Sequence, residues 1–182
     1  MVICGVMWKY CPYNHDLFRS NGLLSIISGL IYKMFRGLSL VNLDTKGRLG
    51  IPIRFRDIFS RLELSDLVLT VNPWDRALLL YPLSEWKEIE LKLSTLSDFE
   101  KGSRRTKLIL RGHATDCRCD AQGRILIPSE LREMSDLRKE VVVSGQGNKL
   151  EIWDSDRWRA ECNSLLASNA SDASAALSTL SL

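Results

Sequence analysis

A ten-residue segment that occurs twice is the feature that most restricts the fold of this chain. The first copy, LDTKGRLGIP, spans residues 43–52, and the second copy, CDAQGRILIP, spans residues 119–128. At an offset of 76 the copies share an Asp, a Gly, an Arg, an Ile and a Pro: Asp44/Asp120, Gly47/Gly123, Arg48/Arg124, Ile51/Ile127 and Pro52/Pro128. Farther on, at an offset of 72, Leu80-Tyr81 corresponds to Ile152-Trp153 and Trp86 to Trp158. The chain is therefore a tandem duplication of a unit of roughly 70 residues.

Each half predicts the same element order, β-β-α-β-β-α. The predicted strands are 38–43, 49–51, 67–71 and 77–81 in the first half and 114–119, 125–127, 141–144 and 150–153 in the second. An Asp-x-x-Gly-Arg turn joins the first two strands of each half, and Gly47 and Gly123 supply the positive φ that such a turn needs. The linkers 72–76 and 145–148 are rich in turn formers and are predicted to close hairpins.

The helices are predicted from their start signals. Pro52 and Pro128 precede short helices at 53–61 and 129–134, because a missing N–H costs nothing in a first helical turn. A longer helix is predicted to end each half, capped by Ser84 in the first and by Asp154 or Ser155 in the second. The first of these is predicted to continue through residues 97–99 toward Arg111.

Each half is close to the lower size limit for an independent core. The two halves are therefore expected to share one core, either interleaved or packed around a pseudo-two-fold axis, in a β-rich mixed α/β fold. Strand edges left exposed would favour further association between chains.

Composition narrows the class of protein. Of 182 residues, 45% are hydrophobic and 26% are charged, which is typical of a globular protein and not of a disordered or coiled-coil chain. The most apolar segment, residues 22–32, is shorter than the roughly 18 to 20 residues that cross a bilayer, so no membrane partner is predicted. Five scattered cysteines do not form a disulfide framework and favour a reducing cytoplasm.

The net charge of +3 hides an alternation along the chain. Residues 34–61 carry +4, residues 62–100 carry −5, residues 101–124 carry +5 and residues 125–182 carry −3. If the two basic blocks fold onto one face, they form an anion-binding surface. The same pattern also fits solvated faces without any partner.

The turns carry the candidate nucleic-acid contacts. Arg48 and Arg124 lie beside a turn glycine, where a guanidinium can reach a phosphate or the O6/N7 edge of guanine. Lys46 corresponds to Gln122, so the first turn is the more basic of the two. The candidate DNA contacts are Arg36, Lys46, Arg48 and Arg124, with Arg54 and Arg56 as phosphate-binding support.

The turn carboxylates have a structural interpretation. Because phosphate repels a carboxylate, Asp44 and Asp120 are expected to orient the arginines or close the turns. The alternative for the arginines is that each Asp–Arg pair only holds its own turn together.

Catalytic and metal sites are not predicted, and no cofactor or small-molecule ligand is expected. His113, Cys117 and Cys119 form a weak metal-like cluster, but a Cys-x-Cys spacing on one strand face favours a buried thiol pair. The chain has two histidines and no P-loop or nucleophile-elbow motif, and Asp44 and Asp120 each have an arginine that lowers a carboxyl pKa. Trp86 and Trp158 are expected to be core residues.

Two segments, MFRGLSLVNLDTKGRLGIPIRFRDIF from Met34 and RCDAQGRILIPSELR from Arg118, resemble the MraZ family of bacterial regulators. The Asp-x-x-x-Arg signature of that family occurs twice, as Asp44…Arg48 and Asp120…Arg124, and the resemblance covers residues 34 to about 166. It implies two tandem SpoVT-AbrB-like domains of the swapped-hairpin type that share a pseudo-two-fold core. It also implies a sequence-specific DNA-binding repressor of the division and cell-wall gene cluster, acting in the cytoplasm and on the nucleoid. A ring-like homo-oligomer on repeated short G-rich sites is the implied assembly.

The resemblance also divides the chain. The predicted parts are an N-terminal extension (1–33), a first domain (34–96), a linking helix (97–111), a second domain (112–162) and a weakly ordered Ser- and Ala-rich tail (163–182). The extension is interpreted as an over-called start, with translation beginning at Met34, and the alternative is a genuine extension. The rival function is a protein-interaction module of the antitoxin type that binds DNA only non-specifically.

Overall fold

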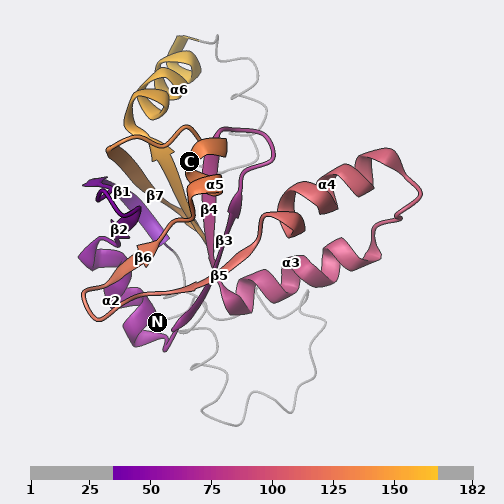
Figure 1. Cartoon of the computed structure of the whole chain (residues 1–182), viewed down its shortest axis with the longest axis horizontal. Coiled ribbons are helices and arrows are strands. Elements are labelled where there is room, and N and C mark those ends of the chain that lie inside the picture. Colours follow the sequence, from indigo (N-terminus) through magenta and orange to yellow (C-terminus); the bar gives the residue numbers. More distant parts are fainter. Residues whose placement is uncertain (1–34, 168–182) are drawn as a thin grey trace, which may run out of the picture. The chain divides into compact units, whose positions relative to one another are not determined.

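The computed structural model describes residues 35–167 (Figure 1). The predicted extension, the start at Met34 and most of the predicted tail lie outside the described residues. All structural statements below refer to residues 35–167.

The order β-β-α-β-β-α occurs twice, as predicted, and a further helix, α4, lies between the two copies. The elements are β1 (Phe35–Asn42), β2 (Arg48–Gly50), α2 (Ile53–Arg61), β3 (Asp66–Val71), β4 (Ala77–Pro82), α3 (Leu83–Thr95), α4 (Lys101–Gly112), β5 (Thr115–Arg118), β6 (Arg124–Leu126), α5 (Ser129–Met134), β7 (Glu140–Gly147), β8 (Leu150–Asp154) and α6 (Ser155–Ala167). The fold is mixed α/β and strand-rich.

The two repeats are interleaved in one antiparallel sheet. Its six strands run in the order β1-β7-β8-β4-β3-β5, and a second, two-stranded sheet pairs β2 with β6. Strand β1 of the first repeat pairs with β7 of the second, while β5 of the second repeat pairs with β3 of the first. Each repeat thus adds its first strand to the hairpin of the other, so both arrangements expected from the sequence, interleaving and pseudo-two-fold symmetry, occur together.

The β2–β6 ribbon shows the symmetry most directly. Leu49 pairs with Ile125 at its centre, Arg48 lies opposite Leu126 and Gly50 lies opposite Arg124. Exchanging the repeats at the offset of 76 reproduces this register. The pseudo-two-fold axis therefore passes between Leu49 and Ile125.

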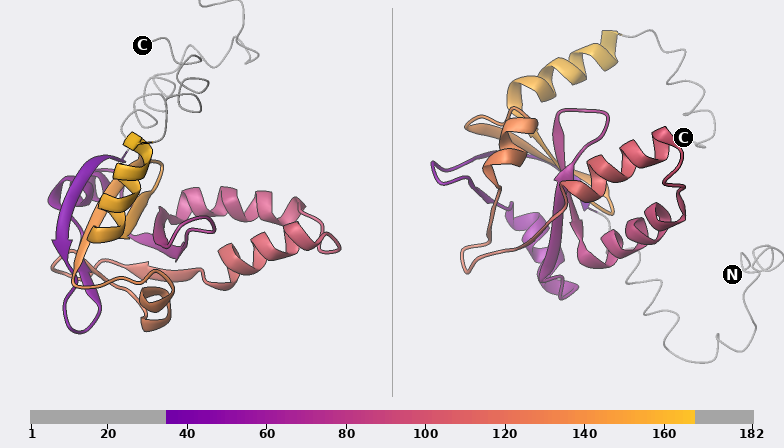
Figure 2. Two further views of the ribbon diagram at one scale, coloured as in Figure 1. Left: turned by 90° about the horizontal axis from the view of Figure 1, so that it is seen from above. Right: turned by 45° about the vertical axis from the view of Figure 1, so that its right-hand side comes forward.

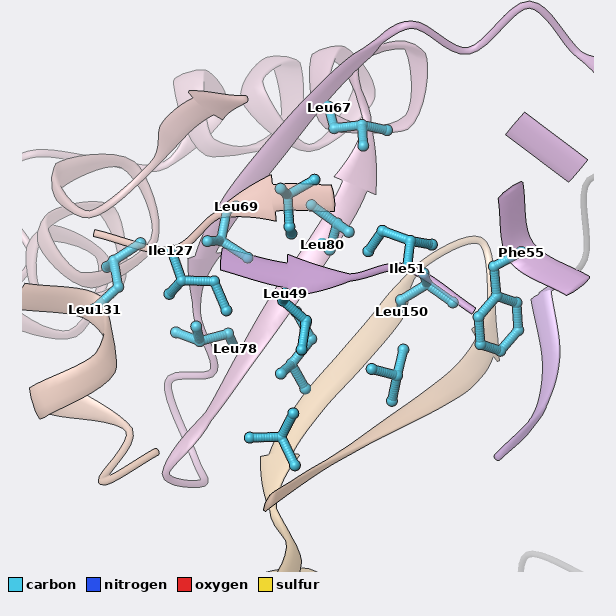
Figure 3. Packing of buried hydrophobic residues seen from close by; sticks show 14 of the residues in the cluster. Leu49, Ile51, Phe55, Leu67, Leu69, Leu78, Leu80, Ile127, Leu131 and Leu150 are labelled. Atoms are coloured by element: carbon cyan, nitrogen blue, oxygen red, sulfur yellow. The ribbon is translucent and has the colours of Figure 1, made fainter. Parts of the chain in front are cut away.

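The hydrophobic core is built from both repeats (Figure 3). Leu49 and Ile51 lie among side chains of the six-stranded sheet, including Leu80 and Leu150, and Ile127 packs into the same cluster. All five side chains are at most 2% exposed. The shared core expected from the sequence is confirmed, and each repeat depends on the other to bury its apolar side chains.

The short helices have the predicted bounds, and each follows its proline directly, with Pro52 and Pro128 at the N-cap positions. The cap prediction is correct for the last helix, because Asp154 Oδ1 accepts hydrogen bonds from the Asp156 and Arg157 amides. The Ser84 cap is wrong. Helix α3 begins at Leu83 with Pro82 at its N-cap, so Ser84 already lies inside the helix.

The prediction of one helix running through residues 97–99 is also wrong. Helix α3 ends at Thr95 and α4 begins at Lys101, and the two form a helical hairpin that projects away from the six-stranded sheet (Figures 1 and 2). Lys107 Nζ donates to the Leu96 carbonyl and to Asp98 Oδ1, each at 2.7 Å, which fixes the reversal of the chain.

The linker predicted at 145–148 is largely strand, because β7 continues to Gly147. The reason is the partner strand: β1 begins at Phe35, three residues earlier than predicted, and Phe35 pairs with Gly147. The backbones approach closely at Gly145, where a Cβ would lie 2.5 Å from the Phe35 carbonyl carbon and the Arg36 nitrogen. Gly145, which suggests a turn in the sequence, instead allows β1 and β7 to approach each other closely.

Candidate nucleic-acid interface

The first Asp–Arg turn, turn 1 (residues 44–48), is built around one carboxylate. Asp44 Oδ1 accepts hydrogen bonds from the Lys46 and Arg48 amides at 2.9 and 2.8 Å. Asp44 Oδ2 accepts from Arg48 Nε at 2.7 Å, and the Gly47 amide donates to the Asp44 carbonyl at 3.0 Å. Gly47 has φ +78°, as the sequence predicts. The carboxylate thus closes the turn and orients the arginine.

The second turn, turn 2 (residues 120–124), repeats this geometry. Asp120 Oδ1 accepts from the Gln122 and Arg124 amides, both at 2.9 Å, and Oδ2 accepts from Arg124 Nε at 2.8 Å. Gly123 has φ +73°. Arg124 is more enclosed by acceptors than Arg48, because its Nη2 also reaches Asp120 Oδ2 at 2.7 Å and donates to Gln122 Oε1.

These contacts keep both carboxylates charged. The Arg48 backbone N–H, followed by the Arg48 side chain, lowers the pKa of Asp44, although desolvation partly opposes the shift. For Asp120 the Arg124 side chain is the largest cause of the lowered pKa. Carboxylates of this kind are ionised at neutral pH and form ion pairs.

The two turns lie at opposite ends of the β2–β6 ribbon. The Ile127 amide donates to the Gly47 carbonyl at 2.8 Å, and the Ile51 amide donates to the Gly123 carbonyl at 2.9 Å. Each turn is therefore fixed to the strand end of the other repeat. Arg48 and Arg124 consequently belong to one continuous ribbon.

Arg36 lies near the start of β1, away from turn 1, and Arg54 of α2 packs beside the same end of the strand. Arg36 pairs with Gln146 across the sheet, and Arg54 covers Gly37, with its guanidinium carbon 5.9 Å from the centroid of the Phe55 ring. At about 3.4 Å per strand residue, β1 separates this end from turn 1 by roughly 20 Å. The six predicted DNA contacts therefore do not form a single cluster.

Arg56 contacts turn 2 rather than turn 1. Its Nη1 donates to the Gln122 carbonyl at 3.1 Å, although Arg56 belongs to the first repeat and turn 2 to the second. The matching residue of the second repeat, Arg132, is not among the predicted contacts; it lies against Gly47 and donates from Nε to the Ile127 carbonyl at 3.2 Å. The offset of 76 maps Arg56 onto Arg132, so the repeat itself carried the signal.

Comparison with known proteins gives the family. The model described as "MraZ protein, putative antitoxin-like" matches the chain twice, over residues 34–109 and 110–179. The chain belongs to the MraZ family.

Curated relatives agree with this assignment. A protein of Marinomonas sp. strain MWYL1 is 45% identical over 137 residues, which cover 75% of this chain and 91% of the relative. A protein of Pectobacterium carotovorum strain PC1 is 48% identical over 125 residues, covering 69% and 82%. Both are named "Transcriptional regulator MraZ". The MraZ model matches once per repeat, so turns 1 and 2 are equivalent parts of the two MraZ repeats.

The surroundings of the two MraZ turns differ in charge. A hollow of about 660 Å³ beside turn 1 is lined by three cationic side chains, Arg132, Arg138 and Lys139, and by the carboxylate of Asp44. The hollow beside turn 2, about 860 Å³, has two cationic residues and three carboxylates: Arg56, Arg118, Asp57, Glu63 and Asp120. The lining beside turn 1 thus carries the more positive formal charge, with Arg132 and Lys139 contributing alongside Arg138, which also pairs with Asp154 and Asp156.

The predicted thiol pair lies against the core. Cys117 and Cys119 both pack on the shared hydrophobic cluster, and burial raises the pKa of Cys117 to about 12 and also raises that of Cys119. Trp86 is 5% exposed, and Trp158 stacks edge-on against Trp153 with ring centroids 5.7 Å apart, so both tryptophans are packing residues.

No group of three His, Cys, Asp or Glu side chains in residues 35–167 is placed to hold a metal ion. None of the helices in this range combines the length and the apolar character needed to cross a bilayer.

Proposed function

We propose that this protein is a sequence-specific DNA-binding transcriptional regulator whose principal DNA contact is made by turn 1. The observation that carries the proposal is the β2–β6 ribbon, which presents two prearranged arginines at its ends. The relatives named transcriptional regulators support a DNA partner. Two-stranded ribbons are narrow enough to enter the major groove of DNA.

Arg48 has the chemistry for base or phosphate contact. Asp44 binds it through Nε, so the Nη edge of the guanidinium remains for a second acceptor, and the side chain is 35% exposed. A guanidinium fixed on one edge offers two parallel donors to guanine O6 and N7 or to a phosphate. Asp44 thus prepares the arginine for DNA without touching DNA itself.

Two differences favour turn 1 over turn 2. The Nη2 group of Arg124 is already bound to Asp120 and Gln122, whereas Arg48 is held through Nε. Lys46 stands where turn 2 has Gln122, and the hollow beside turn 1 is the more basic one. Repulsion of phosphate is therefore weaker at turn 1, and its arginine is more available.

The wider role follows the family resemblance. The protein represses the division and cell-wall gene cluster, works in the cytoplasm on the nucleoid, and has no enzymatic activity. It acts as a ring-like homo-oligomer, and several copies bound to adjacent short repeats multiply weak contacts through effective concentration. The remaining predicted contacts, Arg36 and Arg54, bind phosphates farther along the duplex.

The test is equilibrium binding of the full chain to the DNA upstream of its own gene, measured against a scrambled duplex of equal length over a series of salt concentrations. The proposal predicts at least tenfold preference for the native sequence and a steep loss of affinity with salt. Equal, weak binding to both duplexes would contradict it. That outcome would favour the protein-interaction role indicated by the antitoxin-like description of the family model.

A further inference from the structure

We infer that the two Asp–Arg turns are held in place crosswise: Arg56 of the first repeat positions turn 2, and Arg132 of the second repeat positions turn 1. Both are positioning residues that act through the turns. The consequence for DNA binding rests on the proposed function, whereas the crosswise support itself does not.

Arg56 extends from α2 across the boundary between the repeats. Its Nη1 binds the Gln122 carbonyl at 3.1 Å, and its Cδ fills the position that a Cβ on Gly123 would occupy. The Nε atom is buried in this contact without a hydrogen-bond partner among the described residues. The stem of Arg56 therefore packs on the backbone of turn 2 although one of its donors is left unsatisfied, which points to packing as the basis of this contact.

Arg132 makes the corresponding contact from α5 to turn 1. A Cβ on Gly47 would lie 2.9 Å from Arg132 Cζ and Nε, so the guanidinium rests directly on the glycine. Its Nε donates to the Ile127 carbonyl at 3.2 Å, and the Ile127 amide donates in turn to the Gly47 carbonyl at 2.8 Å. Arg132, Ile127 and Gly47 thus form one connected unit that spans both repeats.

The two contacts are independent observations of one arrangement. Arg56 and Arg132 are separated by the repeat offset of 76, and each lies on the positive-φ glycine of the opposite repeat. The carboxylates of Asp44 and Asp120 bind atoms of their own turns and fix the shape of each turn. The arginine from the other repeat fixes where that turn lies on the ribbon.

This arrangement changes the role expected for Arg56. A phosphate contact is predicted for Arg56 from the sequence, whereas in the structure its guanidinium binds the backbone of turn 2. The crosswise contacts also link each turn to the short helix of the other repeat: turn 1 is held by α5 and turn 2 by α2. A change in α5 of the second repeat is expected to disturb turn 1 of the first.

The test is amide hydrogen exchange of the free full-length protein, followed residue by residue in R132A, R56A and the control R61A. Arg61 also lies on α2, and its Nε binds the Asp57 carbonyl of the same helix. R132A is expected to speed exchange of the Lys46, Gly47 and Arg48 amides at least tenfold and to leave turn 2 unchanged. R56A is expected to do the reverse, at the Gln122, Gly123 and Arg124 amides, and R61A to change neither turn.

Conservative variants separate positioning from general stability. R132K and R56K retain the packed stem and a cationic donor, so each is expected to restore most of the protection in the opposite turn. In the Ala variants, loosening of both turns together, of the turn in the variant's own repeat, or of neither turn would overturn the inference. Should an Ala variant unfold, the Lys variant decides: a small increase in exchange confined to the opposite turn supports the inference, and an increase anywhere else, or none at all, overturns it.

DNA affinity is a separate readout. R132A is expected to lower the affinity for the upstream duplex at least tenfold, and R132K to recover it. Crosswise changes in exchange without any specific DNA binding by the wild type would retain the positioning role and refute the proposed function. Specific DNA binding without crosswise changes in exchange would refute the positioning role alone.

Discussion

Leu49 in β2 and Ile125 in β6 lie opposite each other at the centre of the two-stranded ribbon, and both are 0% exposed. They occupy the same position in the two repeats. The contact between them is thus one of the points at which the two halves of the chain meet, and it lies directly between the two arginine-bearing turns. Stability of the whole fold and the geometry of the candidate DNA-binding surface depend on the same pair.

Truncation of the Leu49 side chain is expected to destabilise both repeats at once. L49A removes a fully buried side chain from the shared core, and the free energy of unfolding should fall by about 2–5 kcal/mol. The neighbouring Leu126 on the same ribbon is 58% exposed, so L126A should change stability by no more than about 0.5 kcal/mol. Urea denaturation of the two variants is the measurement, and equal losses would contradict a core centred on the ribbon.

A glycine is required at position 47 for two reasons: Gly47 has a positive φ, and the neighbouring atoms leave no room for a Cβ. At φ +78° a side chain is strained, and a Cβ would also lie 3.0 Å from the Ile127 carbonyl oxygen. G47A should therefore lower the free energy of unfolding by about 1–3 kcal/mol. Gly50 is a matched control, because it has no atoms within 4 Å of its Cβ position and no positive φ. G50A should leave the denaturation midpoint almost unchanged, and a loss equal to that of G47A would be inconsistent with the geometry of turn 1.

The turn carboxylates give the stability a defined pH dependence. Because folding lowers the pKa of Asp44 and Asp120 below the ordinary 3.8, their contribution is complete above that value and is lost as the pH falls through the folded pKa. The double variant D44N/D120N should thus be less stable than wild type at pH 7, and the difference should shrink below about pH 4. Denaturant titration at both pH values measures it, and a difference independent of pH would refute the ion-pair account of the turns.

Local signals in the sequence predicted the turns well. The spacing of Asp44, Gly47 and Arg48 contains all the groups that close turn 1, and a proline before each short helix fixed the start of α2 and α5. The repeat offset of 76 also identifies Arg132 as the residue equivalent to Arg56, because this correspondence depends only on the alignment of the two copies.

Long-range contacts could not be predicted from such local signals. Gly145 belongs to a strand because β1 pairs with β7, more than 100 residues away in the sequence. The helical hairpin turns after Thr95 because Lys107, on the returning helix, binds the Leu96 carbonyl. Neither contact has a local pattern, and both depend on which segments meet in the folded chain. The crosswise position of Arg56 has the same origin.

The paired variants R48Q and R124Q test most directly whether turn 1 carries the principal DNA contact. Both replace the same side chain at equivalent positions of one ribbon, so effects on folding should be similar. Binding to the upstream duplex at fixed salt should fall at least tenfold for R48Q and two- to threefold for R124Q, because turn 1 is more basic and its arginine less engaged. Equal losses of affinity for the two variants, or a larger loss for R124Q, would contradict the account.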